Sequence, residues 1–129
     1  MGDRAPELKP GKWLGETPDL GGKPAMIEFF HSLNKHSVER LEELNRIAMD
    51  TQGDLVVIVV TREHDPKVQT LLTGGGPAYY PMLDDGVQTF TAYKVKFVPY
   101  SVLHDKRGRI VWLGNPTTLS SDEIVRLIK

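Results

Sequence analysis

Residues 28–37 hold the side chains of this sequence that are best suited to chemistry. The segment reads Glu-Phe-Phe-His-Ser-Leu-Asn-Lys-His-Ser and contains an acid, two histidines and two serines. A serine with a histidine and an aspartate can act as a nucleophile, and histidines can ligate a metal ion. A carboxyl group on a buried strand can exchange protons at a raised pKa. Each of these chemistries depends on a defined spacing of the side chains.

The spacing within this segment favours neither a hydrolase nor a metal centre. Either serine can be combined with a histidine on paper, but no Gly-x-Ser-x-Gly turn surrounds Ser32 or Ser37. His31 and His36 are five residues apart, whereas zinc-ligating histidines on one helix are four apart. The sequence therefore predicts no cofactor and no metal. A histidine-based module for a metal or small ligand is kept as an alternative.

A strand, a helix and a second strand surround these residues. Residues 25–30 are apolar except for Glu28, which predicts a buried strand. Asn34 is a favoured N-cap, and apolar residues follow it at spacings of three and four. These residues are Val38, Leu41, Leu44, Ile47 and Ala48. Residues 55–60 are all Leu, Val or Ile, which predicts a strand buried on both faces of a parallel sheet. Together they predict a right-handed βαβ unit.

The second half of the chain predicts short helices, a hairpin and a terminal helix. Two helical segments, at 65–72 and 87–93, precede strand-like runs at 100–104 and 109–113. The two runs flank a polar turn, so we predict an antiparallel hairpin. Ser-Ser-Asp-Glu at 120–123 is a capping box that opens the last helix. The predicted order is therefore βαβ, a helical connection, and ββα.

Length and charge narrow the range of functions. A chain of 129 residues is long enough for one domain with its own core. Its formal net charge is −1, so we expect no nucleic-acid partner. No apolar run approaches the ~20 residues that span a bilayer, and no apolar signal-peptide core is present. We expect residues 1–23 to form an arm anchored by Trp13 and Leu14, residues 24–129 to form the domain, and the protein to be a monomer.

Four segments of the chain resemble a known family in order and in register. Residues 29–45, Phe-Phe-His-Ser-Leu-Asn-Lys-His-Ser-Val-Glu-Arg-Leu-Glu-Glu-Leu-Asn, resemble the aromatic pair, CxxC motif and first helix of TlpA/ResA-like (redoxin) thioredoxins. Val98-Pro99 is similar to their cis-proline element, residues 104–111 to their hairpin, and residues 13–23 to their lead-in segment. The resemblance implies an α/β thioredoxin fold, with a central mixed sheet of four to five strands flanked by helices.

The resemblance places unreactive side chains where the family has its redox cysteines. Asn34 and Ser37 match the two cysteines, and Glu28 matches the buried acid that moves protons for them. The family is one of thiol-disulfide oxidoreductases, whose exchange reaction requires a thiolate that attacks sulfur. This chain has no cysteine, so as written it cannot perform that reaction. An oxidoreductase whose two cysteines were replaced by substitution is an alternative.

Polypeptide binding is the family property that needs no sulfur. In thioredoxin-like proteins an extended segment pairs with the backbone before the cis-proline, by strand addition. The resemblance implies a groove lined by Phe30, Leu33, Asn34, His36, Val98, Pro99 and Tyr100. We expect either a retained polypeptide-binding site or a purely structural domain. The resemblance also implies a place outside the bacterial cytoplasm if a leader has been removed.

Glu28 is the acid most strongly expected to be buried. Its neighbours on the predicted strand are both apolar, so burial should raise the pKa of its carboxyl group. Lys94 or Lys96 could donate a hydrogen bond to it. The alternative is a structural acid that water or another nearby donor satisfies.

Overall fold

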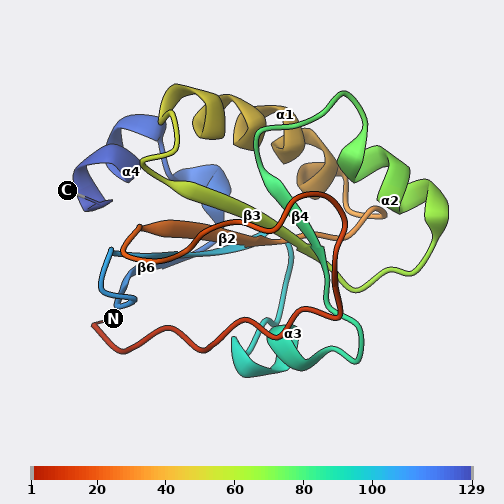
Figure 1. Cartoon of the computed structure of the whole chain (residues 1–129), viewed down its shortest axis with the longest axis horizontal. Helices are drawn as coiled ribbons and strands as arrows, with labels where there is room; N and C mark the ends of the chain where they lie inside the picture. Colours follow the sequence, from red (N-terminus) through yellow and green to blue (C-terminus); the bar gives the residue numbers. More distant parts are fainter. Residues whose placement is uncertain (1, 129) are drawn as a thin grey trace.

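One mixed sheet runs through the middle of the computed structural model, which describes residues 2–128 (Figure 1). Its six strands lie in the order β1-β4-β3-β2-β5-β6. The strands are β1 (Lys12–Trp13), β2 (Ala25–Phe29), β3 (Val56–Thr61), β4 (Tyr80–Leu83), β5 (Tyr100–His104) and β6 (Ile110–Gly114). The helices are α1 (Lys35–Asp50), α2 (Pro66–Thr73), α3 (Gln88–Ala92), the 3-10 helix η1 (Pro116–Thr118) and α4 (Ser121–Ile128). Helices α1, α2 and α4 cover one face, and α3 lies on the other (Figure 1).

The two central strands are buried on both faces, as their apolar runs predict. Strands β2 and β3 pair in parallel, with Ala25 opposite Val56 and Phe29 opposite Val60. Successive side chains point to opposite faces. Met26 therefore joins the core beneath α1 and α4, while its neighbours on the strand join the core beneath α3. Because α1 connects two adjacent parallel strands, its N-terminus lies at the end of the sheet where β2 ends.

The predicted hairpin and capping residues are confirmed. Strands β5 and β6 pair antiparallel around the 105–109 turn. The Asn34 side chain accepts a hydrogen bond from the backbone of α1. The Ser120 hydroxyl accepts from the Glu123 N–H, and the Glu123 carboxylate accepts from the Ser120 N–H. Side chains on both helices therefore satisfy N–H groups that the helix itself cannot.

The sheet has more strands than the four to five predicted. The sixth strand comes from the N-terminal segment, where β1 pairs antiparallel with β4 and Trp13 lies opposite Met82. Two residues are too few to show an alternating pattern in the sequence. The segment continues across the α3 face, where the Tyr93 hydroxyl donates to the Pro6 carbonyl oxygen. Near its start, Arg4 forms an isolated bridge with Arg109.

No helix within residues 2–128 is both long enough and apolar enough to cross a bilayer.

Candidate functional site

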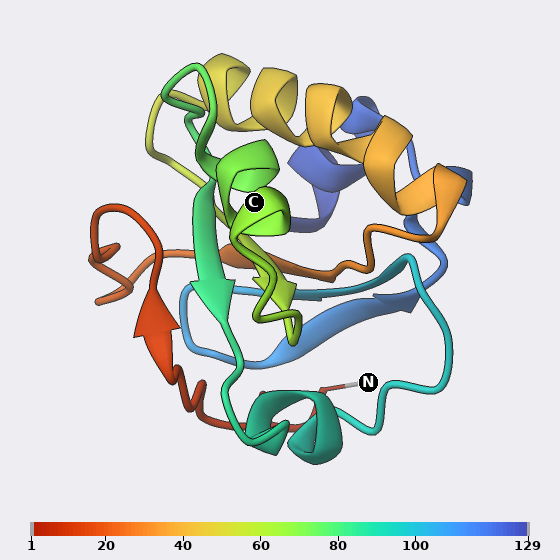
Figure 2. The same cartoon turned by 90° about the vertical axis from the view of Figure 1, so that its right-hand side faces the viewer.

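Two loops meet at the end of the sheet where β2 ends and β5 begins (Figure 2). One loop, residues 30–34, leads into α1, and the other, residues 94–99, leads into β5. Phe29 and Tyr100 are paired across the two strands, which fixes the separation of the loops. The peptide bond between Val98 and Pro99 is cis.

The side chain of Asn34 joins these loops. Its Oδ1 accepts a hydrogen bond from the Ser37 N–H at 3.0 Å, which caps α1. Its Nδ2 donates to the Val98 carbonyl oxygen at 3.0 Å, which ties the cap to the residue before the proline. One amide therefore both starts the helix and positions the cis-proline loop. A cysteine at this position could make neither bond as well, because a thiol is a weak donor and a weak acceptor.

Ser37 is buried without a hydrogen-bond partner for its hydroxyl group. The residue is 1% exposed, and within residues 2–128 its Oγ is the buried side-chain atom that lacks a partner. A buried unsatisfied hydroxyl costs roughly 1–3 kcal/mol. A thiol would be cheaper to bury here, because cysteine behaves as a small apolar residue. The environment at position 37 therefore suits sulfur or carbon better than oxygen.

We expect Ser37→Ala to raise the free energy of unfolding by about 1 kcal/mol, because it removes the unsatisfied hydroxyl. Chemical denaturation measures the change. Alanine has a higher helix propensity than serine, which by itself stabilises α1. Ser37→Cys is therefore the matched variant, because cysteine ranks below serine in helix propensity. Both variants should be stabilised. Loss of stability in both would contradict the unsatisfied state of the hydroxyl.

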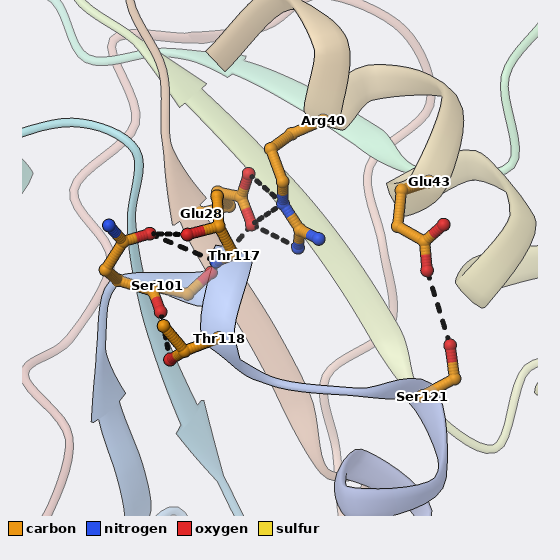
Figure 3. Close-up of polar contacts among 8 residues, drawn as sticks. Glu28, Arg40, Glu43, Ser101, Thr117, Thr118 and Ser121 are labelled. Atoms are coloured by element: carbon orange, nitrogen blue, oxygen red, sulfur yellow. Dashed lines mark hydrogen bonds and ion pairs between the residues drawn. The ribbon is translucent and has the colours of Figure 1, made fainter. Parts of the chain in front are cut away.

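Glu28, Arg40 and Ser101 form a buried cluster on the α1 side of the sheet (Figure 3). The Arg40 Nε donates to Glu28 Oε2 at 3.0 Å, and Arg40 Nη2 donates to Glu28 Oε1 at 2.8 Å. The Ser101 hydroxyl donates to Glu28 Oε1 at 2.9 Å. Glu28 is 2% exposed and Arg40 is 8% exposed. Burial raises the pKa of Glu28, while Arg40 and Ser101 oppose this shift by stabilising the carboxylate.

The predicted partners of Glu28, Lys94 and Lys96, are wrong. Both lysines are exposed in the loop before the cis-proline, and Arg40 of α1 takes their place. The sequence analysis did not identify Arg40, because a charged residue on an amphipathic helix is typical of its solvated face. Its position could have revealed it, because Arg40 follows the buried Ser37 by three residues and precedes the buried Leu44 by four. That spacing places it on the inner face of the helix.

The 30–34 loop is held by Glu63, a residue that the sequence analysis did not identify. Glu63 Oε1 accepts from the Ser32 N–H at 2.8 Å, and its second carboxylate oxygen accepts from the Ser32 hydroxyl. His31 Nδ1 accepts from the Leu33 N–H at 3.1 Å. The Ser32 hydroxyl thus donates to a carboxylate and not to a histidine, so it is not arranged as a nucleophile.

Within residues 2–128, no three His, Asp or Glu side chains are grouped to hold a metal ion.

The residues predicted to line the groove differ widely in exposure. Phe30 is 2% exposed and belongs to the core, so it supports the loop from below. Leu33 is 89% exposed, and His36 is exposed beside Glu39. Val98 and Pro99 of the other loop are half-buried and buried, and Tyr100, the first residue of β5, is half-buried.

Phe97 is a member of this surface that the sequence analysis missed. It is 51% exposed, and its ring packs edge-on against that of Tyr100, with ring centroids 5.3 Å apart. The two most prominent apolar side chains of the site, Leu33 and Phe97, therefore lie on the two loops that Asn34 joins. A single exposed aromatic residue in a loop has no periodic signal in the sequence. We call Leu33, Asn34, Phe97 and Val98 the cis-proline surface.

Solved structures resemble this molecule over nearly its whole length. A putative thiol:disulfide interchange protein DsbE from Chlorobium tepidum matches with a TM-score of 0.83, 19% identity and coverage of 99% of this chain and 97% of its own. A thioredoxin-like protein solved in its oxidised form matches with a TM-score of 0.80, 22% identity and coverage of 96% and 93%. A secreted Mycobacterium tuberculosis disulfide oxidoreductase matches with a TM-score of 0.69, 20% identity and coverage of 84% and 82%.

This chain has the thioredoxin-like fold. The similarity extends across all layers, although no family model and no curated protein sequence matches the chain. The thioredoxin-like domain nevertheless contains no cysteine.

Proposed function

We propose that this is a TlpA-type thioredoxin-like domain that has lost redox activity and binds an extended polypeptide segment at the cis-proline surface. The observation that carries the proposal is the pair of exposed apolar side chains, Leu33 and Phe97, beside the backbone of Val98. The expected absence of redox chemistry rests on the lack of any cysteine.

The backbone of Val98 supports main-chain pairing with a partner. Within residues 2–128 its N–H donates no hydrogen bond. Its carbonyl oxygen accepts from Asn34, but a carbonyl has two lone pairs, so one more bond can form there. An extended segment beside Val98 could therefore accept from the N–H and donate to the carbonyl. Such strand addition supplies affinity through the main chain and selectivity through adjacent side chains.

The apolar side chains supply the second part of the binding site. Leu33 is 89% exposed and Phe97 is 51% exposed, so both lose considerable contact with water when a partner covers them. Full burial of one such side chain is worth about 1.5–3 kcal/mol. The hydrogen bond that Asn34 donates to Val98 and the one that Glu63 accepts from Ser32 hold the loops in place, which lowers the entropy lost on binding.

We also propose a location outside the cytoplasm. One similar structure is described as a secreted disulfide oxidoreductase, and another as an exposed lipoprotein thioredoxin of Streptococcus pneumoniae. The absence of cysteine suits either redox environment. Detection of the protein in fractions of its own source cell tests this proposal.

Titration of ¹⁵N-labelled protein with a library of short extended peptides tests the binding function. Bound peptides should shift the backbone amide signals of Leu33, Phe97 and Val98. We expect Leu33→Ser and Phe97→Ser each to weaken binding by about tenfold, because each removes one apolar contact of roughly 1.5 kcal/mol. Met49→Ser is the matched control, since Met49 is 61% exposed at the opposite end of α1. Shifts confined to other surfaces, or equal effects of all three variants, would contradict the proposal.

A further inference from the structure

Three lysines flank the residues of the cis-proline surface in the sequence. Lys35 follows Asn34 directly, and Lys96 precedes Phe97 directly. Lys94 lies two residues before Lys96. All three lysines are exposed. Within residues 2–128 none of them forms an ion pair.

Glu63, which binds the 30–34 loop, and Glu39, near the start of α1, each have a local partner. Glu63 binds both the N–H and the hydroxyl of Ser32. Glu39 lies one turn along α1 and is 3.8 Å from the imidazole of His36. Neither carboxylate forms an ion pair with a lysine of the two loops. The three lysines outnumber these two carboxylates, so the net charge of the five side chains is positive, although the whole chain has a formal net charge of −1.

We propose that the partner of the cis-proline surface is an extended protein segment in which an apolar side chain is flanked by Asp or Glu residues. This inference rests on the proposed binding function and adds the chemistry of the partner. The apolar side chain covers Leu33 and Phe97, whose exposure is 89% and 51%. Carboxylates on either side of it meet Lys35 from the 30–34 side and Lys96 from the 94–99 side.

The positions of the two lysines make flanking charges the natural complement. Asn34 joins the loops through its bond to Val98, and Lys35 lies one residue after Asn34 while Lys96 lies two residues before Val98. In an extended segment, side chains two residues apart point to the same side, roughly 6–7 Å apart. An apolar residue with acids two positions before and after it would present all three side chains to the surface.

Three peptides of equal length test the partner chemistry. They share one central leucine and differ only at the residues two positions before and after it, which are Glu, Gln or Lys. Binding is measured by the amide shift of Val98 and by fluorescence anisotropy, at low and at high ionic strength. The Glu peptide should bind about tenfold more tightly than the Lys peptide at low salt, because exposed ion pairs contribute modestly and additively. The difference should shrink at high salt, where such pairs are screened.

Charge-reversal variants provide the second readout. Lys35→Glu and Lys96→Glu should each reduce the preference for the Glu peptide, and together they should favour the Lys peptide. Lys106→Glu is the matched control, because Lys106 is exposed in the turn between β5 and β6, at the opposite end of the sheet. Its substitution should leave the order of affinities unchanged.

The outcomes separate the two proposals. Equal binding of all three peptides, with the shift at Val98 retained, would overturn the acidic partner and leave the binding function intact. A preference for the Lys peptide would overturn the acidic partner in the same way. Failure of all three peptides and of the wider library to shift the Val98 amide would overturn the binding function itself.

Discussion

The double variant Asn34→Cys, Ser37→Cys is expected to form a reversible disulfide and to reduce insulin, which the native chain cannot do. Position 34 is the N-cap of α1 and is half-buried. A thiol there lies at the positive end of the helix dipole, which lowers its pKa and raises the fraction of thiolate. Position 37 lies in the first turn and is 1% exposed, which suits a protected resolving thiol.

Mass spectrometry and an insulin-reduction assay measure this prediction. Oxidation should remove two hydrogens from the double variant and none from the native chain, and only the double variant should turn over with a chemical reductant. The single variants are the matched controls. Asn34→Cys should form a mixed disulfide that is not resolved, and Ser37→Cys should react slowly because it is buried. A double variant that remains reduced under oxidising conditions would show that positions 34 and 37 do not align as the resemblance implies.

The double variant should also show what Asn34 contributes to stability. Its reduced form loses the cap on Ser37 and the bond to Val98. Loss of a helix cap costs about 1 kcal/mol. Burial of a thiol in place of the unsatisfied Ser37 hydroxyl offsets part of this loss. The reduced variant should therefore be close to the native chain in free energy of unfolding, while Asn34→Cys alone should be clearly less stable.

Replacement of Arg40 by Met is expected to destabilise the protein by about 3–5 kcal/mol at neutral pH, because it leaves the buried Glu28 carboxylate without its cation. Denaturant unfolding measures the loss. Arg46→Met is the matched control, since Arg46 also lies on α1 and forms ion pairs, but with half its side chain exposed. Its loss should be less than about 1 kcal/mol, as for other surface pairs.

The pH dependence of this loss follows from the direction of the Glu28 pKa shift. Burial raises the pKa of Glu28 above its ordinary value of 4.5, and Arg40 opposes the rise. Without Arg40 the folded-state pKa rises further, so the variant's carboxyl group becomes charged only at higher pH. A raised carboxyl pKa gives stability that is present below the unfolded pKa and is lost as pH rises through the folded pKa. The deficit of Arg40→Met should therefore be smallest near pH 4 and should grow towards neutral pH.

Two further variants separate the ion pair from simple packing. Glu28→Gln, Arg40→Met removes both charges and should recover much of the lost stability, because no uncompensated charge then remains buried. The difference in free energy of unfolding between this double variant and the native chain should vary less with pH than the deficit of Arg40→Met does. A deficit of Arg40→Met that is constant between acid and neutral pH would contradict the role assigned to Glu28.

Local patterns in the sequence predicted most of the fold. The continuous apolar run at 55–60, the Asn34 cap and the capping box at 120–123 each involve residues within a few positions of one another. Their physical causes, which are burial on two faces and satisfaction of the first helical N–H groups, act over the same short range. The two-residue β1 escaped prediction because its formation depends on the edge of β4 and not on its own sequence.

The candidate site was predicted less completely, for the same reason. The absence of cysteine, and with it the absence of dithiol chemistry, is a property of composition alone. The partner of Glu28 was wrong in the sequence analysis because Arg40 and Ser101 reach it from a helix and from another strand. Both Phe97 and Glu63 were missed because a residue's exposure in a loop, or its bond to another loop, leaves no periodic trace.

The sequence alone therefore determined that residues 34 and 37 start a helix and cannot exchange disulfides. Only the tertiary structure decided what those residues do now. Asn34 binds the carbonyl of Val98, 64 positions away, and the Ser37 hydroxyl has no partner among the described residues. Contacts of that kind depend on how the strands place their loops in space, and the short-range propensities that shape helices and strands do not encode them.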